Sequence, residues 1–367
     1  MMRSGKYFGC YGAEQHDPMV MNFSISAEND NKGRRFVIYN QEDIYQCAGK
    51  KQEHFINKFN YHAFRWVLVK GLKDIRLNDI QAMMIGTEIP QIAQVETSNE
   101  LINNIWKLIN HTFECLTHTG YTVDCPHRER IGYGGDMHAS LETSLCNYDL
   151  SAFFNKWIID WRVNNYPTGF WTNSAPEPPQ HNYGFNPGWG AFGVALPWKY
   201  YAYYGDTLNL SRSYPFVKRF INYMNLSVND GILYNDSILA FPERGFLGDW
   251  VPPGYDMSKD GRVDYRSTHL FNNCIYVYVL NMAKNMAIVL DKPEDEKYFE
   301  NLINTSKPKI HELFFNESSR DYANGQQPYL AFPLLTDIVP EIYREEVNKN
   351  LEKLSRVTQA GCPALVP

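Results

Sequence analysis

The stretch Thr122-Val-Asp-Cys-Pro-His-Arg-Glu-Arg-Ile-Gly-Tyr-Gly-Gly-Asp136 decides how the rest of the chain is interpreted. It is too polar for a core element, and its proline and glycines oppose a continuous helix. We therefore predict a curled loop that turns the carboxylates of Asp124, Glu129 and Asp136 toward one cavity.

Carboxylates held close together raise one another's pKa. One of them can then stay protonated near neutrality and act as a general acid, while Arg128 or Arg130 keeps another ionised to accept hydrogen bonds from hydroxyl groups. The alternative is a surface salt-bridge network at the start of a helix, which would have no chemical role. The residues by themselves leave both interpretations open.

Two other chemistries receive less support. Cys115 and His118, followed by Cys125 and His127, have a zinc-like appearance, but the first pair lies in or at the end of an amphipathic helix and the second is not a compact knuckle. We predict packed thiols, ordinary histidines and no metal. The sequence also has no Gly-x-Ser-x-Gly motif, so hydrolysis through carboxylates is favoured over acyl transfer.

The amino-acid composition limits the kinds of molecule that the protein can be expected to bind. Basic residues (35) are outnumbered by acidic ones (41) and form no basic run, which argues against nucleic acid. Aromatic residues make up 15% of the chain, and many cluster with Gly, Pro and Asn at 160–260, a mixture that suits sugars or, alternatively, a large core. No apolar run is long enough to span a membrane, and the seven scattered cysteines suggest reduced thiols. Compartment and oligomeric state stay open.

The organisation of the chain changes near residue 97. Short β-branched or aromatic runs at 19–26, 35–39, 53–59 and 63–69 predict strands and a β-sandwich portion in residues 1–96. From 97 to 367 the apolar residues recur with helical spacing, which predicts a toroid or bundle of helices. The predicted helices are 98–118, 137–163, 190–204, 208–226, 266–290, 293–314 and 341–355, with a weaker one at 326–336. Long loops at 170–189 and 241–255 combine Pro and Gly with Trp and Asp, as binding loops often do.

Residues 124–136 resemble the signature of the bacterial α-L-rhamnosidases of glycoside hydrolase family 78. Further segments resemble family landmarks in the same order: 58–71, 157–161, 187–190, 196–198, 204–206 and 247–250. The resemblance implies a β-sandwich portion followed by an incomplete (α/α)6 barrel. It also implies inverting hydrolysis of terminal α-L-rhamnose from a rhamnose-containing glycan or glycoside, without a cofactor or metal.

The resemblance assigns roles to individual residues. Glu129 takes the general acid position, and Asp124, Arg128 and Asp136 take positions that bind rhamnose hydroxyls. Tyr133 takes an aromatic wall position often held by Trp, and further pocket positions are taken by Trp189, Asp249 and Trp250. Two flanking arginines would lower the pKa of Glu129, so an acid role requires that they pair mainly with other groups or that burial outweighs them.

One family feature is missing. The general base of these enzymes is a Glu in a Gly-Ala-Thr-Thr-x-Trp-Glu stretch, and no Trp of this sequence is followed by Glu. We therefore expect a piece of a bacterial rhamnosidase truncated at both ends, periplasmic or cytoplasmic, and inactive by itself. The alternatives are a non-catalytic glycan-binding fragment and a hydrolase of another sugar on the same scaffold.

Overall fold

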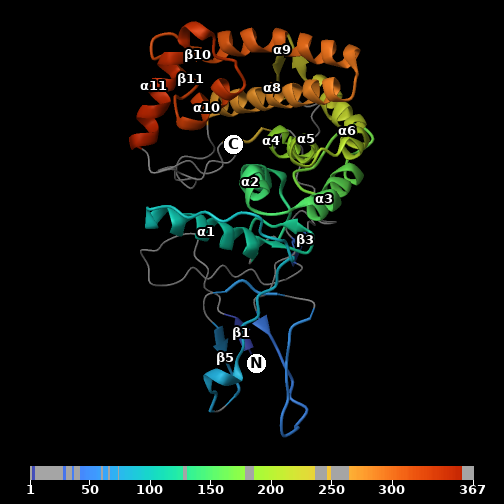
Figure 1. Ribbon diagram of the computed structural model, residues 1–367, viewed down its shortest axis with the longest axis vertical. Coiled ribbons are helices and arrows are strands. Elements are labelled where there is room, and N and C mark those ends of the chain that lie inside the picture. Colours follow the sequence, from blue (N-terminus) through green and yellow to red (C-terminus); the bar gives the residue numbers. More distant parts are fainter. Residues whose placement is uncertain are drawn as a thin grey trace. The chain divides into compact units, whose positions relative to one another are not determined.

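The computed structural model describes residues 2–4, 28–29, 35–36, 42–58, 61–64, 67–72, 74–126, 130–177, 186–235, 246–248 and 264–357 (Figure 1). The chain divides into two compact units. The N-terminal unit comprises Met1–Glu88 and Val95–Ile131, and the helical unit comprises Ile89–Gln94 and Gly132–Pro367. The first predicted helix is counted with the N-terminal unit, and the domain boundary at 96/97 stays a prediction.

The N-terminal unit contains small sheets. Strand β1 (Met2–Ser4) pairs antiparallel with β4 (Glu42–Asp43) and with β5 (Val67–Val69). Strands β2 (Glu28–Asn29) and β3 (Arg35–Phe36) form a second antiparallel pair. The predicted strands at 35–39 and 63–69 are thus found in part as β3 and β5. The described residues show only these small sheets and no clear β-sandwich.

The predicted strand at 53–59 is wrong over its described part, residues 53–58. The Glu53 carboxylate accepts hydrogen bonds from the Tyr45 hydroxyl (2.7 Å) and from the backbone N–H groups of Ala48 (2.9 Å) and Lys50 (2.8 Å). These bonds close a local turn, so the segment starts in irregular structure instead of a ladder. The predicted strand at 19–26 lies outside the described residues.

Helix α1 (Glu100–Leu116) confirms the predicted change of period. The side chain of Asn99 caps it by accepting a hydrogen bond from the backbone N–H of Leu101 at 3.0 Å. A single turn of 3-10 helix, η1 (Leu77–Asp79), precedes it. The short hairpin of β6 (Thr117–His118) and β7 (Tyr121–Thr122) follows and leads directly into the charged loop.

The helical unit is built from pairs of consecutive helices. An inner row runs α2, α5, α8, α10, since each of these packs against the next, and each is followed along the chain by a helix of an outer row, α3, α6, α9 and α11. The longest pair, α8 and α9, lies side by side in Figure 1. The bounds are α2 (Gly134–Asn147), α3 (Ser151–Val163), α4 (Pro187–Gly190), α5 (Phe192–Tyr204), α6 (Thr207–Asn225), α8 (Tyr265–Val289), α9 (Pro293–Phe314), α10 (Gln327–Leu335) and α11 (Glu341–Val357).

Details of this unit differ from the prediction. The single helix expected at 137–163 is two helices, because Tyr148–Leu150 leaves the helical path between α2 and α3. The helical pattern is also interrupted by two short hairpins, β8 (Val228–Asn229) with β9 (Ile232–Leu233) and β10 (Phe315–Asn316) with β11 (Asp321–Tyr322). Such two-residue strands are too short to leave an alternating pattern in the sequence.

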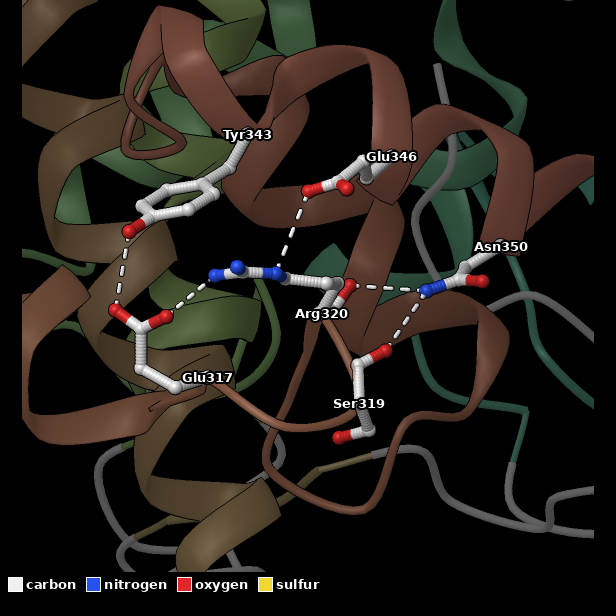
Figure 2. Close-up of polar contacts among 6 residues, drawn as sticks. All are labelled: Glu317, Ser319, Arg320, Tyr343, Glu346 and Asn350. Carbon is white, nitrogen blue, oxygen red and sulfur yellow. Dashed lines mark hydrogen bonds and ion pairs between the residues drawn. The ribbon is translucent and has the colours of Figure 1, made fainter.

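The turn between β10 and β11 is tied to the last described helix by charged groups (Figure 2). The Arg320 guanidinium pairs with the Glu317 carboxylate and lies 3.4 Å from a carboxylate oxygen of Glu346 on α11. Its central carbon stands 4.8 Å from the ring centroid of Tyr343, whose hydroxyl donates to Glu317 at 3.0 Å. This network fixes α11 against the hairpin. Within the described part of the chain, no helix is both long and apolar enough to cross a membrane.

Candidate active site

The charged loop closes on itself at its base. The backbone N–H of Asp124 donates to the carbonyl of Ile131 at 3.2 Å, and the backbone N–H of Ile131 donates to the Asp124 carboxylate at 3.4 Å. Inside this pair, the backbone N–H of Arg130 donates to the carbonyl of Cys125 at 3.2 Å. Residues 124–125 and 130–131 are thus hydrogen-bonded to each other, and the Asp124 carboxylate is partly occupied by the loop's own backbone.

Arg130 anchors this loop within the N-terminal unit. Its guanidinium donates to the carbonyls of Tyr61 at 2.6 Å and Pro126 at 3.0 Å, and lies 4.0 Å from the Tyr61 ring centroid. The residue is only 8% exposed and adopts a left-handed backbone with φ of 59°. A non-glycine residue keeps that conformation only where its surroundings hold it. Arg130 therefore has its charge directed toward backbone carbonyls and an aromatic ring.

His118 lies beside Arg130 in the same buried cluster. It is buried, and its ring meets that of Tyr61 edge-on with centroids 4.5 Å apart. Burial lowers the pKa of His118, and the nearby charge of Arg130 lowers it further. A neutral imidazole is the form compatible with a guanidinium in the same buried cluster.

The start of α2 is held by a backbone pairing with residues 173–175. The backbone N–H of Gly134 donates to the carbonyl of Asn173 at 2.8 Å, and that of Ala175 donates to the carbonyl of Gly132 at 3.2 Å. The Ala175 carbonyl also accepts from the indole N–H of the fully buried Trp157 at 2.7 Å. This pairing fixes where Tyr133, the half-buried N-cap residue, leaves the extended chain and the helix begins.

Asp136 lies in the first turn of α2 and is exposed. A carboxylate in this position interacts favourably with the positive end of the helix dipole. An ionised carboxylate at an exposed helix start can accept hydrogen bonds from hydroxyl groups.

Trp189 is brought to the same helix start by α4. Its half-buried indole lies directly against Gly135, so that a Cβ added to that glycine would be 2.6 Å from the nearest ring atom. The side chain of the fully buried Asn186 caps α4 by accepting from the backbone N–H groups of Gly188 (2.9 Å) and Trp189 (3.4 Å). Sequence reasoning missed α4, although Asn186 followed by Pro187 is a recognisable helix start.

The structure thus brings together three of the predicted site residues, Tyr133, Asp136 and Trp189, in the helical unit. Asp124 belongs to the N-terminal unit. The other four, Arg128, Glu129, Asp249 and Trp250, lie outside the described residues, and their roles stay predictions.

The chain leading to residues 249 and 250 is nevertheless anchored. Asn272 of α8 donates to the carbonyl of Leu247 at 2.8 Å. Gly248 follows so closely over α8 that an added Cβ would meet Thr268 Cγ2 at 3.0 Å and the Tyr329 hydroxyl at 3.0 Å. A larger residue at 248 would therefore press on the side chains of Thr268 and Tyr329.

A polar cluster of the inner row was not predicted. His138 on α2 contacts the hydroxyl of Tyr278 on α8 at 3.3 Å through Nε2, while its buried Nδ1 has no partner. One turn further along α2, Glu142 pairs with Lys199 of α5. Burial lowers the pKa of His138 to about 4, with a smaller contribution from Lys199, so this imidazole is neutral at neutral pH.

Among the described residues no three His, Cys, Asp or Glu side chains converge as metal ligands would. In the zinc-like pattern, Cys115 Sγ lies 3.6 Å from Nε2 of His111 one turn away on α1. His127 lies outside the described residues.

Comparison with models of known protein families shows which family the chain belongs to. The sequence model of the bacterial alpha-L-rhamnosidase 6 hairpin glycosidase domain matches residues 90–363, which is most of the chain. The chain belongs to this rhamnosidase family. The model of the bacterial alpha-L-rhamnosidase concanavalin-like domain matches residues 24–86. The family resemblance found in residues 124–136 is confirmed, and the paired helices of the helical unit are those of a six-hairpin glycosidase fold.

Individual curated relatives and solved structures support the same family assignment. An α-L-rhamnosidase of Formosa agariphila is 30% identical over 285 residues, covering 74% of this chain and 28% of the relative. The solved α-L-rhamnosidase from Dictyoglumus thermophilum superimposes with a TM-score of 0.71 at 27% identity, covering 82% of this chain and 32% of the other. An α-L-rhamnosidase of Streptomyces avermitilis, solved with L-rhamnose, shares the fold with a TM-score of 0.73 at 21% identity, over 85% of this chain and 28% of the other. The chain spans between 28% and 33% of the length of the curated rhamnosidases it matches.

Proposed function

We propose that this chain is part of an inverting α-L-rhamnosidase that removes terminal non-reducing α-L-rhamnose from glycans or glycosides. The proposal is supported by the family and by the names of the relatives. The structural observation that carries it is the half-buried indole of Trp189 at the helix start that bears Tyr133 and Asp136. Aromatic faces beside a carboxyl group suit a deoxy-sugar, which presents C–H faces and hydroxyl groups together.

Glu129 is the proposed general acid. An inverting glycosidase protonates the leaving oxygen with one carboxylic acid, while a carboxylate about 6.5–9.5 Å away activates water on the opposite face of the sugar. Glu129 must therefore stay protonated beside Arg128 and Arg130. The contacts of Arg130 with the carbonyls of Tyr61 and Pro126 are compatible with this role, because they give that guanidinium acceptors in addition to any carboxylate.

The remaining proposed roles concern binding. Asp124, Arg128 and Asp136 accept from or donate to the rhamnose hydroxyls. Tyr133, Trp189 and Trp250 form the aromatic walls, with Asp249 beside Trp250. We also propose the finer architecture of a β-sandwich portion at 1–96 and an incomplete (α/α)6 barrel at 97–367.

The second candidate function is binding of rhamnose without cleavage. It is favoured by one observation, that no Trp in this chain is followed by Glu, so the family's base stretch has no counterpart in it. The aromatic pocket would then retain affinity for the sugar although water is not activated.

The test combines calorimetric titration of this chain with L-rhamnose and hydrolysis of p-nitrophenyl α-L-rhamnoside by the full-length parent protein, because the chain itself lacks the family's base stretch. Sugar binding together with release of nitrophenol identifies a rhamnosidase, and E129Q should then lower turnover by about 10²–10⁴-fold. E300Q, a change of an exposed carboxylate on α9, is the matched control and should leave turnover unchanged.

The other possible results of the two assays distinguish the rhamnosidase from the alternative functions. Binding without release favours the second candidate, whereas release unaffected by E129Q contradicts the assigned acid. Absence of binding and of release contradicts both functions, and turnover of a different aryl glycoside would indicate another sugar.

A further inference from the structure

Two neighbouring glycines open α2, and each has a different part of Trp189 against it. Gly134 and Gly135 are the first two residues of the helix. Neither has a positive φ, so the backbone itself would accept alanine at both positions. Alanine is the better helix former, and a glycine here therefore requires a reason outside the helix.

At Gly135, the space that a side chain would need is taken by an aromatic ring. A Cβ at this position would lie 2.6 Å from Cε2, 2.8 Å from Nε1 and 2.9 Å from Cδ2 of Trp189. These three atoms belong to the five-membered ring of the indole and are almost equally distant, so the ring lies face-on over the glycine. Real side chains do not approach one another so closely, and any larger residue must displace the indole.

At Gly134, the space that a side chain would need is taken by a backbone carbonyl group. A Cβ there would lie 2.3 Å from the carbonyl oxygen of Trp189, 2.9 Å from Cη2 of Trp161 and 3.0 Å from Cβ of Phe192. The carbonyl oxygen remains when the side chain of residue 189 is removed. Gly134 is thus a matched control for Gly135.

The backbone of α4 is held independently of the indole. Asn186 caps its first turn, and a Cβ at Gly188 would lie 3.1 Å from the Phe271 ring of α8. The position of the Trp189 backbone is therefore determined by α4 and α8. With that backbone fixed, the Trp189 side chain can still rotate. The contact with Gly135 restricts the orientation of its indole.

We propose that Gly135 is a positioning residue, whose bare Cα holds the indole of Trp189 face-on at the start of α2 so that the opposite ring face is presented to the sugar. This inference rests on the proposed function. It assigns a specificity role to a residue that cannot itself contact substrate through a side chain.

A thermal-stability cycle tests the packing without any ligand. We expect G135A to lower Tm when Trp189 is present and to keep or raise Tm in the W189A background, where the ring is gone and alanine's helix propensity remains. G134A should lower Tm in both backgrounds. If G135A fails to fold, folding of the G135A/W189A double variant supports the proposal in the same way.

Two results of this cycle would overturn the proposal. If G135A lowers Tm equally with and without the indole, the backbone alone requires the glycine. If G135A leaves Tm unchanged in the presence of Trp189, the ring does not rest on it.

A calorimetric titration with L-rhamnose tests the consequence for binding. G135A should weaken affinity about two- to tenfold, the range of an aromatic platform contact, and should weaken it no further once Trp189 is alanine. A wild-type chain that does not bind L-rhamnose contradicts the proposed function, and the stability cycle still decides the packing. A wild-type chain that binds, with G135A binding equally well, contradicts the positioning role.

Discussion

The start of α2 and the junction between the β10–β11 turn and α11 are held by opposite means. At α2 the backbone pairing with residues 173–175 rests on Trp157, which is fully buried and donates its indole N–H to the Ala175 carbonyl. At α11 the Arg320 side chain is 37% exposed and its partners Glu317 and Glu346 are 69% and 52% exposed (Figure 2). Shape complementarity holds one region and solvated charge holds the other.

The difference sets how each region should respond to substitution. Exposed ion pairs contribute about 0–1 kcal/mol each because water screens them and the side chains lose freedom. Removal of a buried aromatic side chain costs several times more, since it leaves a cavity. Sensitivity should therefore be high at the proposed site and low at the α11 junction.

The largest effect is expected at Trp157. Its ring packs edge-on against Phe192 with centroids 5.2 Å apart, and its N–H donates to the carbonyl of Ala175 in the segment that pairs with the start of α2. W157A should lower the free energy of unfolding by about 3–5 kcal/mol, measured by urea denaturation. W157F retains most of the volume and should cost clearly less. A loss below about 1 kcal/mol for W157A would contradict the comparison.

The next effect concerns His138, which contacts Tyr278 of α8 and Phe192 of α5 and lies near the charge of Lys199, itself paired with Glu142. Its pKa is lowered from 6.5 in the unfolded chain to about 4 in the folded protein. The unfolded state therefore binds more protons between these values, and this group's contribution to stability is present above pH 6.5 and is lost as pH falls toward 4. The loss amounts to at most about 3 kcal/mol.

H138Q removes the titrating group and keeps a polar side chain. The slope of unfolding free energy against pH should become shallower between pH 4 and 6.5 in this variant, while stability at pH 8 changes less. An unchanged slope would show that the imidazole is not kept neutral by burial.

A smaller effect is expected for Asn350 on α11. Its side-chain amide donates to the carbonyls of Ser319 at 3.1 Å and Arg320 at 2.9 Å. N350A leaves these carbonyls to water and should cost about 1 kcal/mol in urea denaturation. K349A changes the neighbouring exposed residue and should stay within about 0.5 kcal/mol. Equal costs for the two variants would remove any special role of the amide.

The smallest effect is expected for Glu346. E346Q removes one carboxylate from beside Arg320, and we expect a change within about 0.5 kcal/mol at low ionic strength. The change should vanish in about 1 M salt, where the screening length falls to a few ångströms. A loss that is larger and insensitive to salt would show that the junction behaves like the buried region.

Helix positions were predicted well where the signal is local. Helix α9 occupies 293–314 as predicted, and α1 begins after its Asn99 cap. The break between α2 and α3 was missed because distant groups produce it. The backbone N–H of Asp149 donates to the Pro90 carbonyl at 2.9 Å, and that of Leu150 donates to the Tyr204 hydroxyl at 2.9 Å. Neither partner is visible in the periodicity of residues 137–163.

At the candidate site, too, local features could be predicted from the sequence, whereas contacts between distant segments could not. The clustering of Asp124, Glu129 and Asp136 in one polar stretch was readable from the sequence, as was the closed loop that Pro126 predicts. The contact between Gly135 and the Trp189 indole was not, because the two residues are brought together only by the packing of α4 on α2.

The sequence by itself determined the family, the starts of helices such as α1 and α9, and the residues proposed to carry the chemistry, since caps, prolines and helical periodicity act between near neighbours. Only the tertiary structure decided which face of Trp189 is covered, which carbonyls engage Arg130 and why His138 stays neutral. Those outcomes depend on close packing and burial between segments far apart in the chain, and both are properties of the assembled fold.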